Sequence, residues 1–288
     1  MGLIQTPTAD SSDEGTISLN LNRNDIWKLG TLSVSPFDWL EASYFYYRPS
    51  DLTWAGVPGL YLDKGFNIKL IYKSKNINIP NFALGLDDFA GTGYFDREYF
   101  VATNQYKNAN ITIGMGWGKF VGVNQFNNPL GQLADGFKVR PGQSDYYKRG
   151  GTLSLDKWFR GNATAFGGIE YFPKKLKRLS IKLEYDPYDY MDISAIGNPG
   201  ASFALRKKDS NINYGISYSI NNFLTLGASY IKGNTFNLNF NMAITFNSQL
   251  RSKPKFEANI NINNDNASQP ELLFYEDLLR NLNSNNLL

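Results

Sequence analysis

The chain has 288 residues, of which 42% are hydrophobic and 19% are charged, and its net charge is only +3. This weak positive charge gives no reason to expect a nucleic-acid partner, because no Lys- or Arg-rich stretch is interleaved with stacking aromatics. The absence of His and Cys excludes disulfides and a Ser-His-Asp site, and it disfavours zinc and other transition metals, so we expect no metal and no cofactor.

The first ten residues, MGLIQTPTAD, contain neither the basic nor the apolar region of a signal peptide. No run of about 18 apolar residues follows, so the sequence predicts no membrane-spanning helix. Because the strands described next indicate an exported protein, we expect a signal peptide to have been removed. Residues 1–14 are then expected to form a periplasmic or lumen segment ahead of the first strand.

Twelve segments alternate between apolar and polar residues and are separated by turn residues, which predicts twelve β-strands. They are Gly15–Asn22, Leu29–Ser35, Trp39–Arg48, Lys64–Lys73, Ile79–Phe89, Arg97–Tyr106, Ala109–Gly118, Ala163–Phe172, Leu179–Asp186, Ile212–Ile220, Phe223–Ile231 and Thr235–Asn247. The segment Arg97–Tyr106 is the least clear, because it is apolar on both faces.

The last of these segments, TFNLNFNMAITFN, places an unbroken apolar row on one face and mostly Asn and Thr on the other. Tilted strands of about 9–11 residues span a hydrocarbon core of ~30 Å, and this segment is long enough. In Leu179–Asp186 the inward row is Ser180, Lys182, Glu184 and Asp186. Three charges on one face do not suit a soluble core, whereas they suit a water-filled lumen.

The connections between the segments alternate in length. Tight turns such as Lys107–Asn108 alternate with connections that include three long ones, Pro49–Asp63, Lys119–Asn162 and Pro187–Asn211. Bacterial outer-membrane barrels have short periplasmic turns and longer external loops. The sequence therefore predicts an all-β fold, a transmembrane antiparallel β-barrel over residues 15–247 in the outer membrane of a Gram-negative bacterium, with both termini periplasmic. A soluble all-β protein has similar composition but shorter strands.

The long connection Lys119–Asn162, which contains Tyr146 and Tyr147, is expected to narrow the lumen by folding into it. A twelve-stranded barrel lies between filled small barrels and open porins, so we predict a narrow or plugged lumen. The glycines of GMGWG, at 114–118, offer a flat wall against which an inward loop or a sugar chain can pack, the loop being favoured.

Beyond the barrel, residues 248–288 are predicted to form a periplasmic linker and an amphipathic helix, Glu271–Leu282. A short helix with one apolar stripe requires a partner, either the barrel mouth or a periplasmic partner or following domain.

The candidate lumen or ligand residues are the inward polar residues and the aromatics of the large loop. They are Lys69, Asp87, Lys182, Glu184, Asp186, Trp117, Tyr146 and Tyr147. Two carboxylates about 5–10 Å apart are what a glycosidase requires, and Glu184 and Asp186 share a face. We favour the interpretation that these charges line a pore and pair with lysines, so no catalytic residue is assigned.

Several stretches resemble the YjbH-like (GfcD-related) outer-membrane family, in this order along the chain. They are GLIQTPTADSSDEGTISL, SPFDWLEASYFY, ALGLDDFAGTGYFDREYFVATNQY, ITIGMGWGKF and FGGIEYF. The resemblance implies an outer-membrane barrel linked to exopolysaccharide or group 4 capsule production. The family's chains are longer than this one, and some carry a lipoprotein cysteine that is absent here.

Together the pattern and the resemblance favour a non-enzymatic barrel that contacts outer-membrane lipid and helps a polysaccharide to be exported or assembled at the cell surface. A second hypothesis is a plugged structural barrel that scaffolds periplasmic partners through Glu271–Leu282. A third is a general small-solute porin. A barrel enzyme using Glu184 and Asp186 is the least favoured.

Overall fold

The computed structural model describes residues 2–51, 53–54, 57–58, 61–91, 93, 95–141, 153, 155–191 and 203–246. The predicted helix Glu271–Leu282 and the candidate residues Tyr146 and Tyr147 lie outside these residues. Within them, the structure contains no helix with the length and apolar character needed to cross a membrane.

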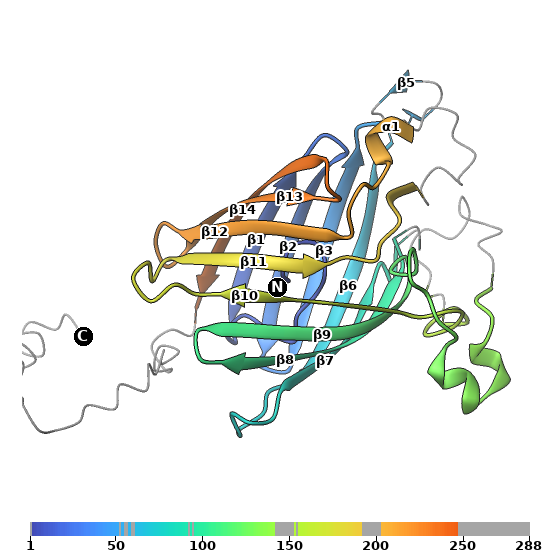
Figure 1. Cartoon of the computed structure of the whole chain (residues 1–288), viewed down its shortest axis with the longest axis horizontal. Coiled ribbons are helices and arrows are strands. Elements are labelled where there is room, and N and C mark those ends of the chain that lie inside the picture. The colour runs from blue at the N-terminus through green and yellow to red at the C-terminus, as the bar shows by residue number, and fades with distance from the viewer. Residues whose placement is uncertain are drawn as a thin grey trace, which may run out of the picture. The chain divides into compact units, whose positions relative to one another are not determined.

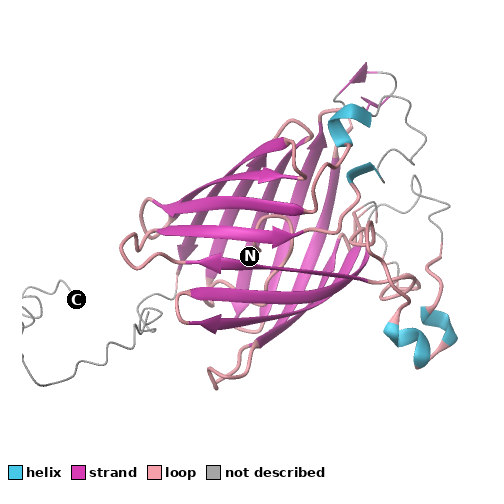
Figure 2. Cartoon of the chain, viewed as in Figure 1, coloured by secondary structure: helices cyan, strands magenta, loops and turns pink. Residues whose placement is uncertain are grey.

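Twelve strands of the described chain close into one antiparallel barrel (Figure 1). They are β1 (Thr16–Arg23), β2 (Trp27–Phe37), β3 (Leu40–Pro49), β6 (Asp63–Tyr72), β7 (Asn81–Asp87), β8 (Arg97–Tyr106), β9 (Ala109–Gly118), β10 (Thr164–Tyr171), β11 (Leu179–Tyr185), β12 (Ile212–Ser219), β13 (Leu224–Ile231) and β14 (Thr235–Thr245). The barrel closes because β1 pairs with both β2 and β14. The remaining elements are short and lie in connections (Figure 2): β4 (Thr53–Trp54), β5 (Val57–Pro58), η1 (Pro129–Gln132), η2 (Asp135–Phe137) and α1 (Phe203–Arg206).

The prediction of a twelve-stranded barrel is confirmed, and the strand ends differ only locally. Strand β2 begins at Trp27, two residues before the predicted start, whereas β7 begins at Asn81 and not at Ile79. Pro80 explains the second difference, because a proline has no N–H to donate to the ladder.

The outer face of the barrel is largely apolar. Exposed outward side chains include Ile17, Leu19 and Leu21 on β1, Ile113 on β9, Leu183 on β11 and Phe236 and Leu238 on β14. A soluble protein rarely exposes an apolar surface of this extent, so this band is the lipid-facing surface of a transmembrane barrel.

The two ends of the barrel differ in their connections. The turns between β2 and β3, β6 and β7, β8 and β9, β10 and β11, and β12 and β13 are at one end, which we call the short-turn end. The long connections are at the other, the long-loop end (Figure 1). Because Thr16 is opposite Thr245, β1 starts and β14 finishes at the short-turn end.

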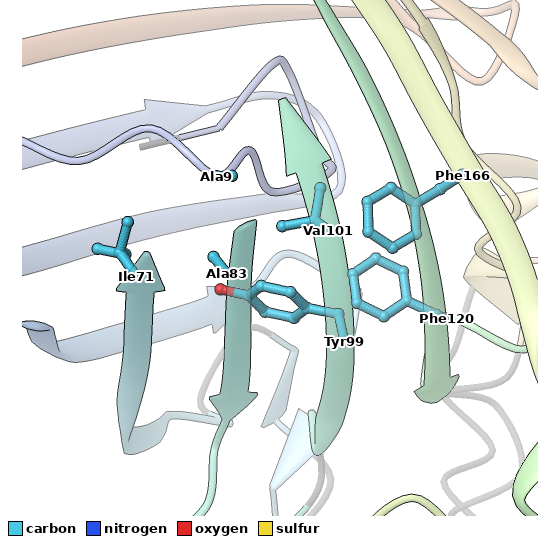
Figure 3. Close-up of a cluster of buried hydrophobic side chains, with 7 residues drawn as sticks. All are labelled: Ala9, Ile71, Ala83, Tyr99, Val101, Phe120 and Phe166. Atoms are coloured by element: carbon cyan, nitrogen blue, oxygen red, sulfur yellow. The ribbon is translucent and has the colours of Figure 1, made fainter. Parts of the chain in front are cut away.

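One buried apolar cluster lies inside the barrel between β6, β7, β8 and β10 (Figure 3). Its members are Ala9, Ile71, Ala83, Tyr99, Val101, Phe120 and Phe166. Phe120, just beyond β9, stacks on Phe166 at a centroid distance of 4.9 Å. A Cβ at Gly116 would lie only 2.6 Å from the Phe120 ring, so this glycine provides the space for the inward turn. The cluster explains why β8 is apolar on both faces.

A second buried cluster closes the long-loop end. It contains Ile26, Trp27, Phe45, Tyr47, Tyr190 and Ile231. Trp27 and Tyr190 stack with their rings 5.7 Å apart and 5° from parallel. Tyr190 belongs to the connection after β11, so this connection packs onto the inner rim of the barrel.

Candidate functional site

The N-terminal residues Gly2–Asp10 occupy the lumen as a small hairpin. The hairpin turns where the Leu3 N–H donates to the Thr6 carbonyl at 2.9 Å, and Gly2 forms an isolated bridge with Pro7. Most of its side chains, including those of Leu3 and Thr6, are buried. The N-terminal end lies within the barrel outline in Figure 1. We call this segment the N-terminal hairpin.

The tip of the N-terminal hairpin surrounds the carboxylate of Glu184 on β11. The backbone N–H groups of Ile4, Gln5 and Thr6 donate to this carboxylate at 2.8–3.0 Å. The Thr6 hydroxyl donates at 2.8 Å, and the amide of Asn213 on β12 donates at 2.9 Å. Glu184 is fully buried, and these donors replace the water that a buried carboxylate would otherwise lack.

Two cationic side chains hold the backbone carbonyls of the same hairpin. Lys182 donates from Nζ to the Leu3 carbonyl at 3.0 Å and pairs with Glu170 at 3.4 Å. Arg97 donates to the Gln5 carbonyl at 3.4 Å while its Nε and Nη2 bind Asp87 at 2.9 and 2.6 Å. Each cation therefore has a carboxylate partner from the barrel wall and a carbonyl partner from the N-terminal hairpin.

Strands β8 and β6 hold the last two residues of the N-terminal hairpin, Ala9 and Asp10. The Ala9 N–H donates to the Thr103 hydroxyl at 2.9 Å. Lys69 donates to the Asp10 carbonyl at 2.8 Å and pairs with Glu41 at 3.1 Å. The hairpin therefore runs along the β6–β11 side of the lumen from the level of Glu184 toward the short-turn end.

Asp186 lies just beyond β11 and anchors the cluster at the long-loop end. It accepts from the Tyr190 hydroxyl at 2.7 Å and the Tyr188 N–H at 3.0 Å, and Asn213 reaches it at 3.3 Å. Burial, and then the adjacent Asp186 carboxylate, raise the pKa of the Tyr190 phenol well above its ordinary value. Burial lowers the pKa of Lys208, which donates to the Asp186 and Tyr188 carbonyls.

A buried ion pair joins two of the long connections at the same end. Arg206 in α1 donates from Nε and Nη2 to the two oxygens of Asp51, both at 2.6 Å, and both residues are buried. Burial opposes the charged form of Arg206, but the Asp51 carboxylate and the nearby Tyr47 favour it, so the pKa of Arg206 is raised. A bidentate buried pair of this kind fixes the relative positions of the two connections.

Part of the connection after β9 contacts outward-facing residues of the barrel. Arg140 binds Glu98 at 2.7 Å and Asp96 at 2.7 Å, and Phe159 packs edge-on against Trp117 at 5.2 Å. Glu98 and Trp117 are opposite one another and belong to the outward rows of β8 and β9. The prediction of an inward loop is therefore right for Phe120 and wrong for these residues, which follow the outer face.

The structure brings together several of the predicted lumen residues. Lys69, Lys182 and Glu184 bind the N-terminal hairpin directly, and Asp87 orients Arg97, which also binds it. Asp186 shares Asn213 with Glu184. Trp117 does not face the lumen, because its row is the outward one.

Sequence reasoning left open whether residues 1–14 lie in the periplasm or in the lumen, and it missed the contacts of the N-terminal hairpin with Glu184 and Arg97, together with the role of Asn213. The hairpin has no period-2 pattern, and its only signal was its place in the stretch that carries the family resemblance. No group of three or more His, Cys, Asp or Glu residues positioned to hold a metal occurs in the described part of the chain.

Comparison with known proteins gives one family. The model described as exopolysaccharide biosynthesis protein YbjH matches residues 1–287. The uncharacterized lipoprotein YjbH of Escherichia coli (strain K12) is 32% identical over 253 residues, which are 86% of this chain and 34% of that protein. The chain thus spans about a third of the length of this curated relative.

Several solved barrels are distantly similar to the chain. The KdgM porin has a TM-score of 0.39 and 13% identity, covering 80% of this chain and 99% of that one. The NanC porin has a TM-score of 0.38 and 10% identity, covering 80% and 98%. Similarity at this level says nothing about function, and the assignment of the fold rests on the strand pairing described above.

Proposed function

Because this chain belongs to the YjbH family of exopolysaccharide biosynthesis proteins, we propose that it acts as an outer-membrane barrel in the export or assembly of an exopolysaccharide, such as capsule, at the cell surface. In this proposal the short-turn end and both ends of the barrel chain face the periplasm, as in other bacterial barrels. The observation that carries the proposal is the N-terminal hairpin bound in a polar lumen inside an apolar outer surface. A barrel that fills part of its own lumen differs from the open diffusion pores of about 16–18 strands, and large outer-membrane transporters also have a plugged lumen.

The contacts of the lumen carboxylates support a role without catalysis. Both oxygens of Glu184 accept hydrogen bonds from the N-terminal hairpin, and Asp186 accepts from Tyr190 and the backbone. A glycosidase acid and its partner must reach a substrate bond between them. In this arrangement the two carboxylates hold protein groups.

A structural barrel that scaffolds partners without transport is the second candidate. The buried contacts that hold the hairpin, with the Arg206–Asp51 pair over the long-loop end, favour it. The two candidates differ in whether removal of the hairpin opens a path.

Conductance of the refolded chain in planar bilayers separates these functions. We compare the wild-type chain, a variant lacking residues 2–10, and a variant lacking residues 119–162. Export predicts a silent wild type and current after removal of residues 2–10, whereas scaffolding predicts silence in all three. Open-channel current in the wild type would favour a small-solute porin and contradict the proposal.

A cellular measurement tests the link to polysaccharide. Surface polymer is measured in the producing bacterium with the wild-type gene and with the barrel deleted, and Ile113→Leu on the lipid face serves as the control variant. We expect polymer to be lost only on deletion. Unchanged polymer in the deletion strain would overturn the proposed function.

A further inference from the structure

The inner wall of the barrel is divided into two unlike halves. The half formed by β3 and by β6 to β11 carries the charges and aromatics that hold the N-terminal hairpin and Phe120. The other half is formed by β12, β13, β14, β1 and β2, and its inward residues carry no charge. They are Asn213, Gly215, Ser217, Ser219, Thr225, Gly227, Ser229, Ile231, Thr235, Asn237, Asn239, Asn241, Ala243, Thr245, Thr16, Ser18, Asn20, Asn22, Trp27, Leu29, Thr31, Ser33 and Ser35. We call this half the neutral wall.

Water reaches the middle of the neutral wall. Asn20, Asn239 and Ser217 point inward and yet are half-exposed. On the opposite side, the inward residues Thr103 and Thr112 are buried. The difference arises because the N-terminal hairpin and Phe120 pack against the β6–β11 side and leave the facing wall uncovered.

The exposure of the neutral wall changes along the barrel axis. On β12, β13 and β14 the residues nearest the long-loop end are buried, as Asn213, Ile231 and Asn237 show. Toward the short-turn end the inward residues of the same strands, such as Ser219 and Thr225, are half-exposed. On β1 and β2, by contrast, Thr16 and Ser35 at this end are buried. The water-accessible space therefore opens toward the short-turn end along β12, β13 and β14.

The closed end is built by specific contacts. The ring stack of Trp27 on Tyr190 lies there, and the Trp27 indole donates to Asn22 at 2.9 Å. Asn24 donates to Asn237 at 3.1 Å across the same end. The space beside the neutral wall is thus a vestibule with one closed end.

We propose that this vestibule binds a segment of an uncharged glycan that enters from the short-turn end. Asn amides and Ser or Thr hydroxyls both donate and accept, which matches the hydroxyl groups of a neutral sugar. Pores for anions use rings of Arg or Lys, and the neutral wall has none. That the ligand is a polysaccharide rests on the proposed function.

The cations of the opposite wall do not replace the Arg or Lys ring that a pore for anions would have. Lys69, Arg97 and Lys182 each bind a wall carboxylate and a carbonyl of the N-terminal hairpin. An acidic glycan would have to displace these partners. The electrostatics of the vestibule therefore select a neutral chain over an acidic one.

Cysteine accessibility tests the vestibule directly, because the chain has no cysteine of its own. Ser217→Cys and Asn239→Cys report on the neutral wall, and Thr112→Cys is the matched inward control on the covered wall. The full 288-residue chain is refolded in detergent, and its heat-modifiable migration verifies that each variant is folded. Neutral, anionic and cationic methanethiosulfonate reagents of similar size are then compared.

We expect the two wall cysteines to react with the neutral reagent at least about ten-fold faster than the Thr112→Cys variant. Their rates with anionic and cationic reagents should differ by less than about ten-fold, the smallest enrichment that a charged cleft produces. Equal rates for wall and control cysteines would overturn the vestibule, and a larger preference for the anionic reagent would overturn its neutrality.

Protection of the same cysteines tests the ligand class. Maltohexaose and cellohexaose are the neutral probes, and hexagalacturonate is the acidic one. Slower labelling of Ser217→Cys with a neutral probe alone supports the inference, whereas protection by the acidic probe, or by none, overturns it. This measurement uses purified protein and is independent of the polymer measurement in cells. The absence of protection therefore does not contradict the proposed function, and unchanged polymer in cells does not contradict a measured protection.

Discussion

The substitution Glu184→Gln should release the N-terminal hairpin from the lumen. Glu184 accepts from three backbone N–H groups and one hydroxyl of the hairpin, and from Asn213. A glutamine keeps one accepting oxygen and presents an NH₂ group where the second oxygen was. Even with the glutamine oxygen placed to accept from Ile4 and Thr6, its NH₂ group would face the Gln5 N–H of the hairpin and the Asn213 amide.

The size of the effect follows from these unmet donors. A buried donor without an acceptor costs about 1–3 kcal/mol, so the Gln5 N–H alone removes about this much of the free energy that keeps the hairpin in the lumen. Since every 1.4 kcal/mol is tenfold, the released population should rise by at least about five-fold. The fold should remain, because the strand pairing of β11 does not depend on this carboxylate.

Hydrogen exchange of the amides of residues 2–10 measures the release. Their exchange should accelerate in the Glu184→Gln variant, while that of the β14 amides stays unchanged. Glu170→Gln is the control on the neighbouring strand, because Glu170 pairs at 3.4 Å with Lys182, and a glutamine there leaves the donation from Lys182 to the Leu3 carbonyl in place. Equal exchange in the wild type and the Glu184→Gln variant, or equal acceleration in both variants, would refute the reasoning.

Three further predictions concern other parts of the structure. Gly116→Ala should destabilise the barrel by about 1–3 kcal/mol through collision with Phe120, whereas Gly30→Ala, where the nearest outside atom is 3.6 Å from the added Cβ, should have little effect in the same thermal unfolding assay. Arg206→Met should cost about 3–5 kcal/mol because it leaves a buried carboxylate without its cation, measured as faster proteolysis of the long connections. Burial raises the pKa of the Tyr190 phenol, so its contribution to stability is present below pH ~10 and is lost only above this, as the folded-state pKa is passed. The difference in tyrosinate absorbance between the wild type and Tyr190→Phe should therefore appear only at a pH above that of an ordinary tyrosine.

The barrel itself was predictable because its strands obey a two-residue period. In β14 the outward row of Phe and Leu and the inward row of Asn require only the alternation of side chains. The same rule placed Lys182 and Glu184 inward on β11, where the structure has them. The alternation of short and long connections then predicted that β1 starts and β14 finishes at the same end of the barrel, as the strand pairing has them.

The partner of each inward charge was not predictable from the same rule. Alternation shows that Glu184 faces the lumen but leaves open whether it meets water, a lysine or a backbone. The answer is a hairpin about 180 residues earlier in the chain, whose own residues have no periodic pattern. Contacts made by backbone N–H groups leave no side-chain signature, so sequence reasoning has nothing to detect.

The large connection after β9 shows a different limit. The glycines of β9 correctly indicated that something packs against them, and Phe120 and Phe166 fill that space. The later part of the connection follows Arg140 to the outward face at Glu98. Because the row of Trp117 is outward by alternation, a ligand role for it in the lumen was already inconsistent with the strand pattern.

The N-terminal hairpin is the physical cause of the division of the lumen into a filled half and a hydrated half. The N-terminal hairpin removes water from the β6–β11 side, so every charge there needs a partner, and Lys69, Arg97 and Lys182 each have a wall carboxylate. When the hairpin leaves, these ion pairs remain and water replaces the hairpin carbonyls. Glu184 then loses most of its hydrogen-bond donors, but water reaches its carboxylate and replaces them. Release of the hairpin therefore breaks ordered hydrogen bonds without leaving a charge unpaired in a dry interior. The neutral wall needs no partner in either state, which is why it can remain hydrated beside a filled half of the same barrel.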